Sequence, residues 1–270
     1  MDNLLDQKIL VYCGALSGAE IGHGIVLAKI FRKELCLFST YRDLNEKEEV
    51  KSRLHQLSIG VIKDNPDVQC SWLFLKGKAE DLMDKLADDY NAILMVVARL
   101  YARQLMSALK NSGFPFVFVS GVSDHIPVYK KILMPVDFRK ECKEAGLWAS
   151  YFGRFNYSEV YFVEANEIGN YEENRLKLNL VFLFKLLRQF NIHYKTIKSK
   201  SGSWRIQSSA LKIASVKKAD LFIILGSRND SFLDQLIGSP EIRILRKSGD
   251  LPVLCVNPRR DMYVMCEGMG

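Results

Sequence analysis

The residues that could do chemistry lie mainly in the second half of this 270-residue chain. A polar segment, residues 226–229 (Gly-Ser-Arg-Asn), follows an apolar run, and Gly238 with Ser239 comes a few residues later. Glycine lets the backbone approach a ligand closely, and backbone N–H groups, hydroxyls and guanidinium groups all donate to phosphate oxygens. These residue types therefore indicate the binding of a phosphate-containing anion.

Residue arrangements that drive catalytic turnover are not recognisable in the sequence. We find no paired carboxylates and no serine, histidine and aspartate arrangement. The histidines lie in different predicted elements without a shared spacing, which argues against a metal site. The cysteines lack a CxxC pair and mostly lie inside apolar runs, as buried free thiols do. We therefore predict that the protein is not an enzyme.

Composition and charge narrow the class of protein further. Hydrophobic residues make up 48% of the chain and charged residues 26%, as in an ordinary globular protein. The net charge of +7 favours anionic partners, and a nucleotide, a nucleic acid or an acidic protein would all qualify. The N-terminal segment does not resemble a signal peptide, and no apolar run reaches the roughly 20 residues that span a bilayer. We expect a cytoplasmic protein without a membrane partner.

Short apolar runs alternate with longer segments of helical period, which is typical of successive βαβ units in a parallel sheet. The first series of predicted strands comprises residues 8–13, 35–39, 70–75, 92–97 and 115–119. The second series comprises residues 130–136, 158–164, 192–198, 220–225 and 252–256. Right-handed crossovers leave few layouts for five strands, and the doubly wound layout is the commonest. The sequence thus predicts an α/β fold of two tandem, doubly wound, five-stranded parallel sheets.

The two series also repeat individual residues. Residues 8–11 (Lys-Ile-Leu-Val) return as 131–134 (Lys-Ile-Leu-Met), and 114–117 (Phe-Pro-Phe-Val) return as 251–254 (Leu-Pro-Val-Leu). A small, polar, proline-containing stretch separates the two copies. The predicted organisation is a first domain at 1–124, a second domain at 125–258 and a tail at 259–270.

The last strand of each half should not be left bare. An apolar edge such as residues 116–119 (Phe-Val-Phe-Val) invites aggregation, and both fifth strands begin with a proline, which edge strands tolerate. We therefore expect the two fifth strands to pair, which would make the chain an intramolecular pseudo-dimer. A homo-oligomer is left open.

The second half resembles the universal stress protein family at both ends of its sheet. Residues 132–137 (Ile-Leu-Met-Pro-Val-Asp) are similar to the family's first strand, I-L-x-P-x-D. Residues 226–229 and 238–239 are similar to the family's G-x-x-G, nine residues, G-[S/T] loop. The first half is similar only in its repeat pattern. The resemblance implies an adenine nucleotide alpha hydrolase-like fold, in a tandem form whose halves pair through their last strands.

The resemblance also implies a nucleotide site in the second half. In family members that bind ATP, the aspartate contacts the nucleoside and the glycine loop holds the phosphates. The implied ATP-binding residues, with which Mg²⁺ could associate, are Asp137, Gly226, Ser227, Arg228, Asn229, Gly238 and Ser239. The implied function is that of a stress-response sensor or regulatory module with at most slow, incidental ATP hydrolysis.

Other interpretations stay open beside this one. Asn229 replaces the loop's second glycine, and eight residues rather than nine separate it from Gly238. Residues 239–241 (Ser-Pro-Glu) also have the pattern of an ordinary helix start, and Asp137 could cap the next helix. The alternative function is a ligand-independent protein-interaction module with a relic site. An ATP-using adenylating enzyme comes third, because both halves lack the glycine-serine loop of the first strand.

Two further segments are expected not to bind ligands. The first predicted strand of the first half ends in Cys13 and Gly14 without an acidic residue, and residues 96–100 contain no glycine. We therefore expect the first half to bind no nucleotide. Residues 151–155 (Tyr-Phe-Gly-Arg-Phe) combine aromatic and basic side chains, but at a helix end they are better explained by core packing than by nucleic-acid binding.

Overall fold

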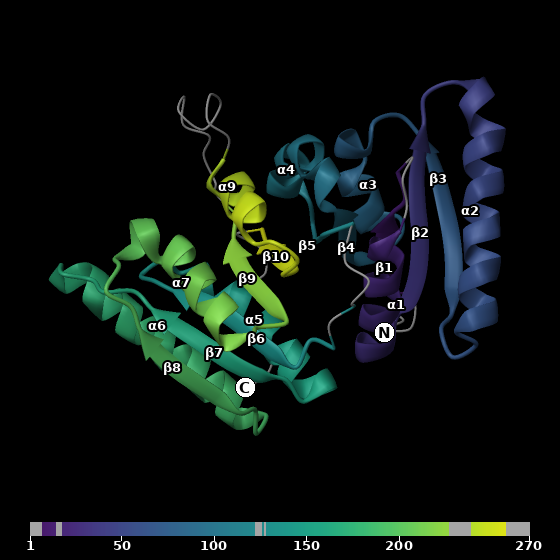
Figure 1. The fold of residues 1–270 in the computed structure, drawn as a ribbon. Coiled ribbons are helices and arrows are strands. Elements are labelled where there is room, and N and C mark those ends of the chain that lie inside the picture. The colour runs from purple at the N-terminus through teal and green to yellow at the C-terminus, as the bar shows by residue number, and fades with distance from the viewer. Residues whose placement is uncertain (1–6, 15–17, 122–125, 127, 227–238, 258–270) are drawn as a thin grey trace. The chain divides into compact units, whose positions relative to one another are not determined.

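A computed structural model describes residues 7–14, 18–121, 126, 128–226 and 239–257 of the chain. The chain divides into two compact units, Met1–Val128 and Tyr129–Gly270. Each unit alternates strands with helices, as Figure 1 shows, and each contains five parallel strands. The predicted α/β class and the two parallel sheets are confirmed, and each predicted strand end lies within two residues of the observed one.

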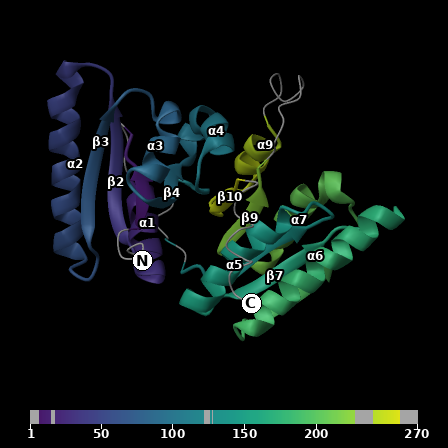
Figure 2. The same cartoon turned by 180° about the vertical axis from the view of Figure 1, so that it is seen from behind.

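The first unit forms its sheet in the order β3-β2-β1-β4-β5. Its strands are β1 (Lys8–Tyr12), β2 (Glu34–Tyr41), β3 (Cys70–Lys76), β4 (Ala92–Ala98) and β5 (Phe116–Val119). Its α-helices are α1 (Ala19–Phe31), α2 (Leu44–Asp64), α3 (Met83–Asp88) and α4 (Ala102–Asn111), with 3-10 turns η2 (Ala79–Asp81) and η3 (Arg99–Tyr101). Helix α2 packs along β2 and β3, and α1 packs along β1 and β4 (Figures 1 and 2).

The second unit forms its sheet in the order β10-β9-β6-β7-β8, which is the same topology. Its strands are β6 (Lys131–Val136), β7 (Glu159–Glu164), β8 (Tyr194–Lys198), β9 (Leu221–Leu225) and β10 (Val253–Val256). Its described helices are α5 (Cys142–Asn156), α6 (Asn170–Gln189), α7 (Ser203–Lys217) and α9 (Pro240–Lys247). Each unit therefore repeats one doubly wound pattern.

The core of each unit lies along its central strands. Every residue of β9 is buried, and β6 is buried throughout except at Lys131. Strands with helices on both faces need apolar residues at successive positions rather than at alternate ones, which explains the continuous apolar runs of the sequence. Strands β5 and β10 are also buried, and their expected pairing stays a prediction. No helix among the described residues is long and apolar enough to span a bilayer.

Candidate functional site

The second unit has its topological switch point between β6 and β9. The chain runs from β6 outward to β7 and β8, and then returns to β9 and β10 on the other side of β6. In sheets of this type, ligands bind outside the carboxyl ends of the strands at the switch point. A ligand site is therefore expected at the residues that follow β6 and β9, which include Asp137 and Gly226.

The two strands at this switch point pair over a short distance only. The β6–β9 register comprises Ile132 with Leu221 and Leu133 with Phe222, whereas β6 and β7 pair over all six residues of β6. Continuing the β6–β9 register by four residues puts Asp137 level with Gly226. The ladder between the strands thus stops before the level at which the two predicted site residues lie.

Asp137 is buried beneath Arg139. The Asp137 side chain is 1% exposed and that of Arg139 is 35% exposed. Arg139 Nε donates to Asp137 Oδ1 and Oδ2 at 3.1 and 2.9 Å, and Nη2 donates to Oδ2 at 2.6 Å. The Arg139 backbone N–H also donates to Oδ1, at 2.9 Å. A ligand that approaches the end of β6 would therefore meet the guanidinium group before the carboxylate.

Two further side chains fix this loop. Asn179 of α6 is buried, and its Nδ2 donates to the backbone oxygens of Asp137 and Arg139 at 2.9 and 2.8 Å. Cys142 Sγ, at the start of α5, lies 3.3 Å from Asp137 Oδ1. Burial, and then the neighbouring Asp137 charge, raise the pKa of the Cys142 thiol well above its usual value, so the thiol stays protonated and donates to the carboxylate. These contacts connect the loop after β6 to α5 and α6.

The other described site residues have structural roles. The Gly226 N–H donates to the Val256 backbone oxygen at 2.9 Å, which extends the β9–β10 ladder. Ser239 is the N-cap of α9, where its hydroxyl accepts from the Ile242 N–H at 3.4 Å. Proline follows in the first turn, as the helix-start interpretation expects. Ser227, Arg228, Asn229 and Gly238 lie outside the described residues.

Sequence analysis missed Arg139 and Asn179. Asn179 interrupts an apolar stripe of α6 formed by Leu176, Leu180 and Leu183, and a buried polar residue in such a stripe needs a hydrogen-bond partner. Asn179 could therefore have been recognised from the sequence as a residue with a buried hydrogen-bond partner. The two-residue spacing of Asp137 and Arg139 carried no comparable signal, because many loops have charged residues at that spacing.

The switch point of the first unit is filled by a side chain of the chain itself. Strands β1 and β4 stay paired up to Tyr12 and Val97, the last residue of β1 and the last but one of β4. The Tyr101 phenol then lies so close to Gly14 that a Cβ at Gly14 would overlap it. The Tyr12 and Tyr101 rings meet edge to face, with centroids 5.1 Å apart. Tyr101 thus occupies the space in which a ligand would approach Gly14.

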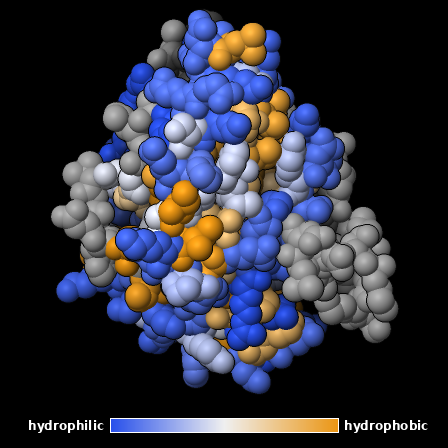
Figure 3. Space-filling view, turned by 90° about the vertical axis from the view of Figure 1, so that its right-hand side faces the viewer, coloured by the Kyte–Doolittle hydropathy of each residue, from blue (hydrophilic) through white to orange (hydrophobic). Residues whose placement is uncertain are grey.

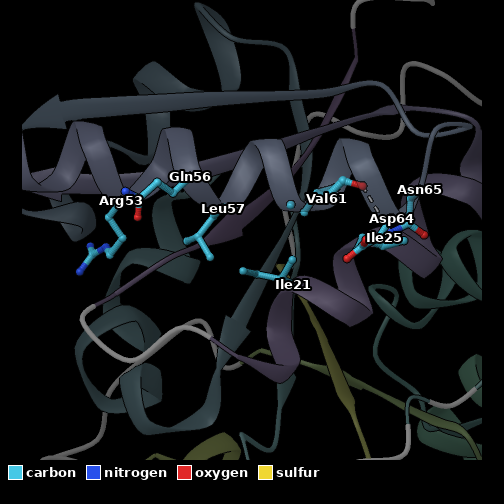
Figure 4. Close-up of a pocket in the computed structure, with 9 residues that line it drawn as sticks. Ile21, Ile25, Arg53, Gln56, Leu57, Val61, Asp64 and Asn65 are labelled. Carbon is cyan, nitrogen blue, oxygen red and sulfur yellow. Dashed lines mark hydrogen bonds between the residues drawn. The ribbon is translucent and has the colours of Figure 1, made fainter.

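A separate groove of about 420 Å³ runs between α1 and α2 of the first unit. Figure 4 shows Ile21 of α1 facing Leu57 of α2 in its middle, with Arg53 toward one end and Asp64 toward the other. Ligand sites usually combine an apolar lining with a few polar groups that converge. The charged groups of this groove lie at opposite ends, so we do not place the functional site there. Within the described ranges, no three histidine, cysteine, aspartate or glutamate side chains gather as a metal site would need.

Comparisons with known proteins identify the fold. No protein-family model matches the sequence, and no curated protein matches it. A universal stress protein from Archaeoglobus fulgidus DSM 4304 has a similar structure, with a TM-score of 0.72 and 14% identity, over 96% of this chain and 100% of that chain. A functionally unknown protein from Pseudomonas aeruginosa PAO1 matches with a TM-score of 0.62 and 12% identity, over 97% of this chain and 96% of that chain.

A candidate universal stress protein from Pseudomonas aeruginosa UCBPP-PA14 also matches, with a TM-score of 0.62 and 11% identity, over 98% of both chains. These similarities extend over both units. The TM-scores establish the fold, and at such low sequence identity the function has to be argued from the site. The chain therefore has the fold of the universal stress proteins.

Proposed function

We propose that this chain is a nucleotide-responsive regulatory module of the universal stress type, whose second unit binds ATP at the switch point between β6 and β9. One observation carries the proposal: the β6–β9 ladder ends early beside a partly exposed arginine, Arg139, whereas Tyr101 fills the equivalent place in the first unit. The shared fold supports the proposal, because ligands of doubly wound sheets bind at this position.

The proposed phosphate contact is Arg139. Asp137 engages Nε and Nη2 of Arg139, which fixes the plane of the guanidinium group and leaves Nη1 for an anion. A planar guanidinium held in this way suits a phosphate, because the side chain loses little further freedom when it binds. We propose that the residues of the loop motif that follow β9 in the sequence complete the site: Gly226, Ser227, Arg228, Asn229, Gly238 and Ser239. Mg²⁺ would bind with the phosphates.

We propose binding rather than catalysis for this site. The Asp137 carboxylate, the acid closest to the end of β6, accepts hydrogen bonds from Arg139 and Cys142 on both oxygens. A general base needs a free lone pair within reach of the proton that it removes. Asp137 lacks that freedom, so the proposed role is to orient Arg139.

A second function is favoured by two contacts at the same place. The Gly226 N–H donates to the sheet ladder and not to a ligand in this conformation, and the Ser239 hydroxyl oxygen is held at the start of α9 because it accepts the cap hydrogen bond. These contacts support the alternative of a ligand-independent interaction module that kept the fold after losing the nucleotide.

The test compares thermal unfolding of nucleotide-free protein with and without millimolar ATP and magnesium. A ligand at a hundredfold excess over its dissociation constant stabilises the folded state by about 2.7 kcal/mol, so the melting temperature should rise. Arg139→Lys should reduce that rise, because lysine keeps the charge and loses the fixed planar donor group. Arg154→Lys is the matched control, since Arg154 lies in the last turn of α5, away from the switch point, and stacks on Phe190.

The two proposed functions give different outcomes. Binding at the switch point requires that wild type and Arg154→Lys respond to ATP equally and Arg139→Lys responds less. If nucleotide-free wild type does not respond to ATP, the ligand-independent module becomes the better explanation. Equal responses of all three proteins would show that ATP binds at another site.

A further inference from the structure

Strand β3 forms an outer edge of the first unit's sheet and has an unusual composition for that position. It pairs with β2 on one side, and no other strand of the described chain pairs with it. Its sequence, Cys-Ser-Trp-Leu-Phe-Leu-Lys, contains no charged residue before Lys76 and no proline. Every residue from Cys70 to Leu75 is partly exposed. An uncharged edge strand of this kind is a template for pairing with another chain.

The hydrogen-bonding groups on this edge can be assigned from the β2–β3 ladder. The Leu35 N–H donates to Gln69 O, and the Gly77 N–H donates to Tyr41 O. The odd-numbered residues of β3 therefore turn their backbone groups toward β2. Because these groups alternate along a strand, those of Cys70, Trp72, Phe74 and Lys76 point away from β2.

The equivalent edge of the second unit is protected. Strand β8 has the sequence Tyr-Lys-Thr-Ile-Lys, and its two lysines, Lys195 and Lys198, are exposed. Charged side chains, lysine above all, are a common device against the pairing of edge strands. Since β3 and β8 have the same place in the repeated topology, their difference lies in the residues and not in the fold.

Helix α2 presents exposed apolar side chains beside the β3 edge. His55 of α2 meets Trp72 edge to face, with ring centroids 6.2 Å apart, so this side of α2 faces β3. Ile59 and Ile62 lie four and seven residues after His55, on the same side of the helix, and are 52% and 47% exposed. Figure 3 looks from the right-hand side of Figure 1, and apolar residues there lie in several groups between hydrophilic ones.

We propose that β3 pairs with β3 of a second copy of this chain, antiparallel, about a twofold axis at Leu73. Leu73 is the midpoint of the seven-residue strand, so this register pairs the strand with itself from end to end. Trp72 of one copy lies opposite Phe74 of the other, and Cys70 lies opposite Lys76. All the outward backbone groups of both copies are paired, and the interface is isologous, as closed dimers require.

Aromatic pairs directly opposite each other across antiparallel strands stabilise a sheet, which favours this register over its neighbours. In the same register, the two Leu73 residues form a pair without mutual backbone hydrogen bonds, with Cα atoms about 4.5 Å apart. That distance is within the range of a disulfide. The register can therefore be tested with cysteine substitutions.

The first experiment measures the mass of the full-length protein by sedimentation at about 100 µM. We expect a dimer, and Phe74→Lys, which gives β3 a charge of the kind that protects β8, should weaken dimerisation at least about tenfold. Circular dichroism of the variant shows whether it has folded. The proposal is overturned by a monomeric wild type, which would leave the edge to a strand of another protein, or by a folded Phe74→Lys variant that dimerises as strongly as wild type.

The second experiment tests the register and does not depend on Phe74→Lys. Cys266 of the tail is first replaced by serine so that it cannot cross-link, and in this background Leu73→Cys should form a disulfide-linked dimer under mild oxidation. Leu75 lies on the same face of β3 as Leu73. In the proposed dimer the two residues at position 75 are four residues apart along the strands, roughly 13 Å, so Leu75→Cys should not cross-link. Equal cross-linking of the two variants, or none with Leu73→Cys, would refute the twofold axis at Leu73.

Discussion

Replacing His23 should remove much of the acid sensitivity of the first unit. His23 lies on α1, is 2% exposed, and burial lowers its pKa from 6.5 to about 4. Between these values the unfolded chain binds a proton that the folded chain does not, so stability falls as the pH decreases from 6.5 towards 4. At pH 5 the two pKa values give a loss of about 2 kcal/mol relative to neutral pH.

Glu20, also buried on α1, acts in the opposite direction and must be separated from His23. Burial raises the pKa of Glu20, so the folded state holds this proton above the unfolded pKa of 4.5, and stability from Glu20 rises as the pH decreases. A His23→Leu variant isolates the histidine because Glu20 is present in both proteins. Its free energy of unfolding should fall between pH 7 and pH 5 by about 2 kcal/mol less than that of wild type.

The assay is urea unfolding followed by circular dichroism at the two pH values. His193→Gln is the control, since His193 is exposed in the loop before β8, and this variant should keep the wild-type difference between the two pH values. A His23→Leu variant with the full wild-type difference would show that burial of His23 does not set the acid sensitivity, and the reasoning would be wrong.

Three further predictions concern residues in helices and are measured by urea unfolding. Gly60→Ala in α2 should stabilise the protein by about 0.5–1 kcal/mol, because its Cβ meets no atom within 4 Å and alanine favours helix. Gly146→Ala in α5 should instead destabilise it by about 1–3 kcal/mol, since its Cβ would overlap Leu183 of α6. Asn179→Ala should cost about 1–3 kcal/mol by removing the hydrogen bonds to the Asp137 and Arg139 carbonyls. A stabilising Gly146→Ala or a neutral Asn179→Ala would contradict the packing described.

The fold could be predicted because its signals are local. Apolar runs such as that of β9 are continuous along the chain, and helical segments separate them at regular intervals. The loop after β6 could be predicted only in part. Asp137 has a recognisable place at the end of a strand. The groups that donate hydrogen bonds to its carboxylate come from the loop itself and from α5, and Asn179, which donates to its backbone oxygen, comes from α6. Such contacts depend on how helices pack, which the periodicity of a single sequence does not specify.

The role of Tyr101 could not be predicted for the same reason. In the sequence it is one aromatic residue after an apolar strand, and only the fold brings it against Gly14, which lies 87 residues earlier in the chain. The missing acid at Cys13 and Gly14 predicted that the first unit has no nucleotide site. It did not predict that a side chain fills the space.

The two units fill the space at the switch point in different ways, and this difference is the basis on which we propose a ligand site in one of them and not in the other. A switch point leaves a crevice, and an unfilled crevice loses the contacts that its walls would otherwise make. The first unit fills the space with the Tyr101 ring, which packs on Tyr12 and lies against Gly14. The second unit buries a carboxylate there, and the cost of burying that charge is offset by the ion pair with Arg139 and by the hydrogen bonds from the Arg139 N–H and the Cys142 thiol. Arg139, which pairs with the buried carboxylate, is itself partly exposed to solvent. The ion pair fixes the Arg139 guanidinium group at the end of β6 without a ligand, and for this reason we propose that the second unit is the one that responds to ATP.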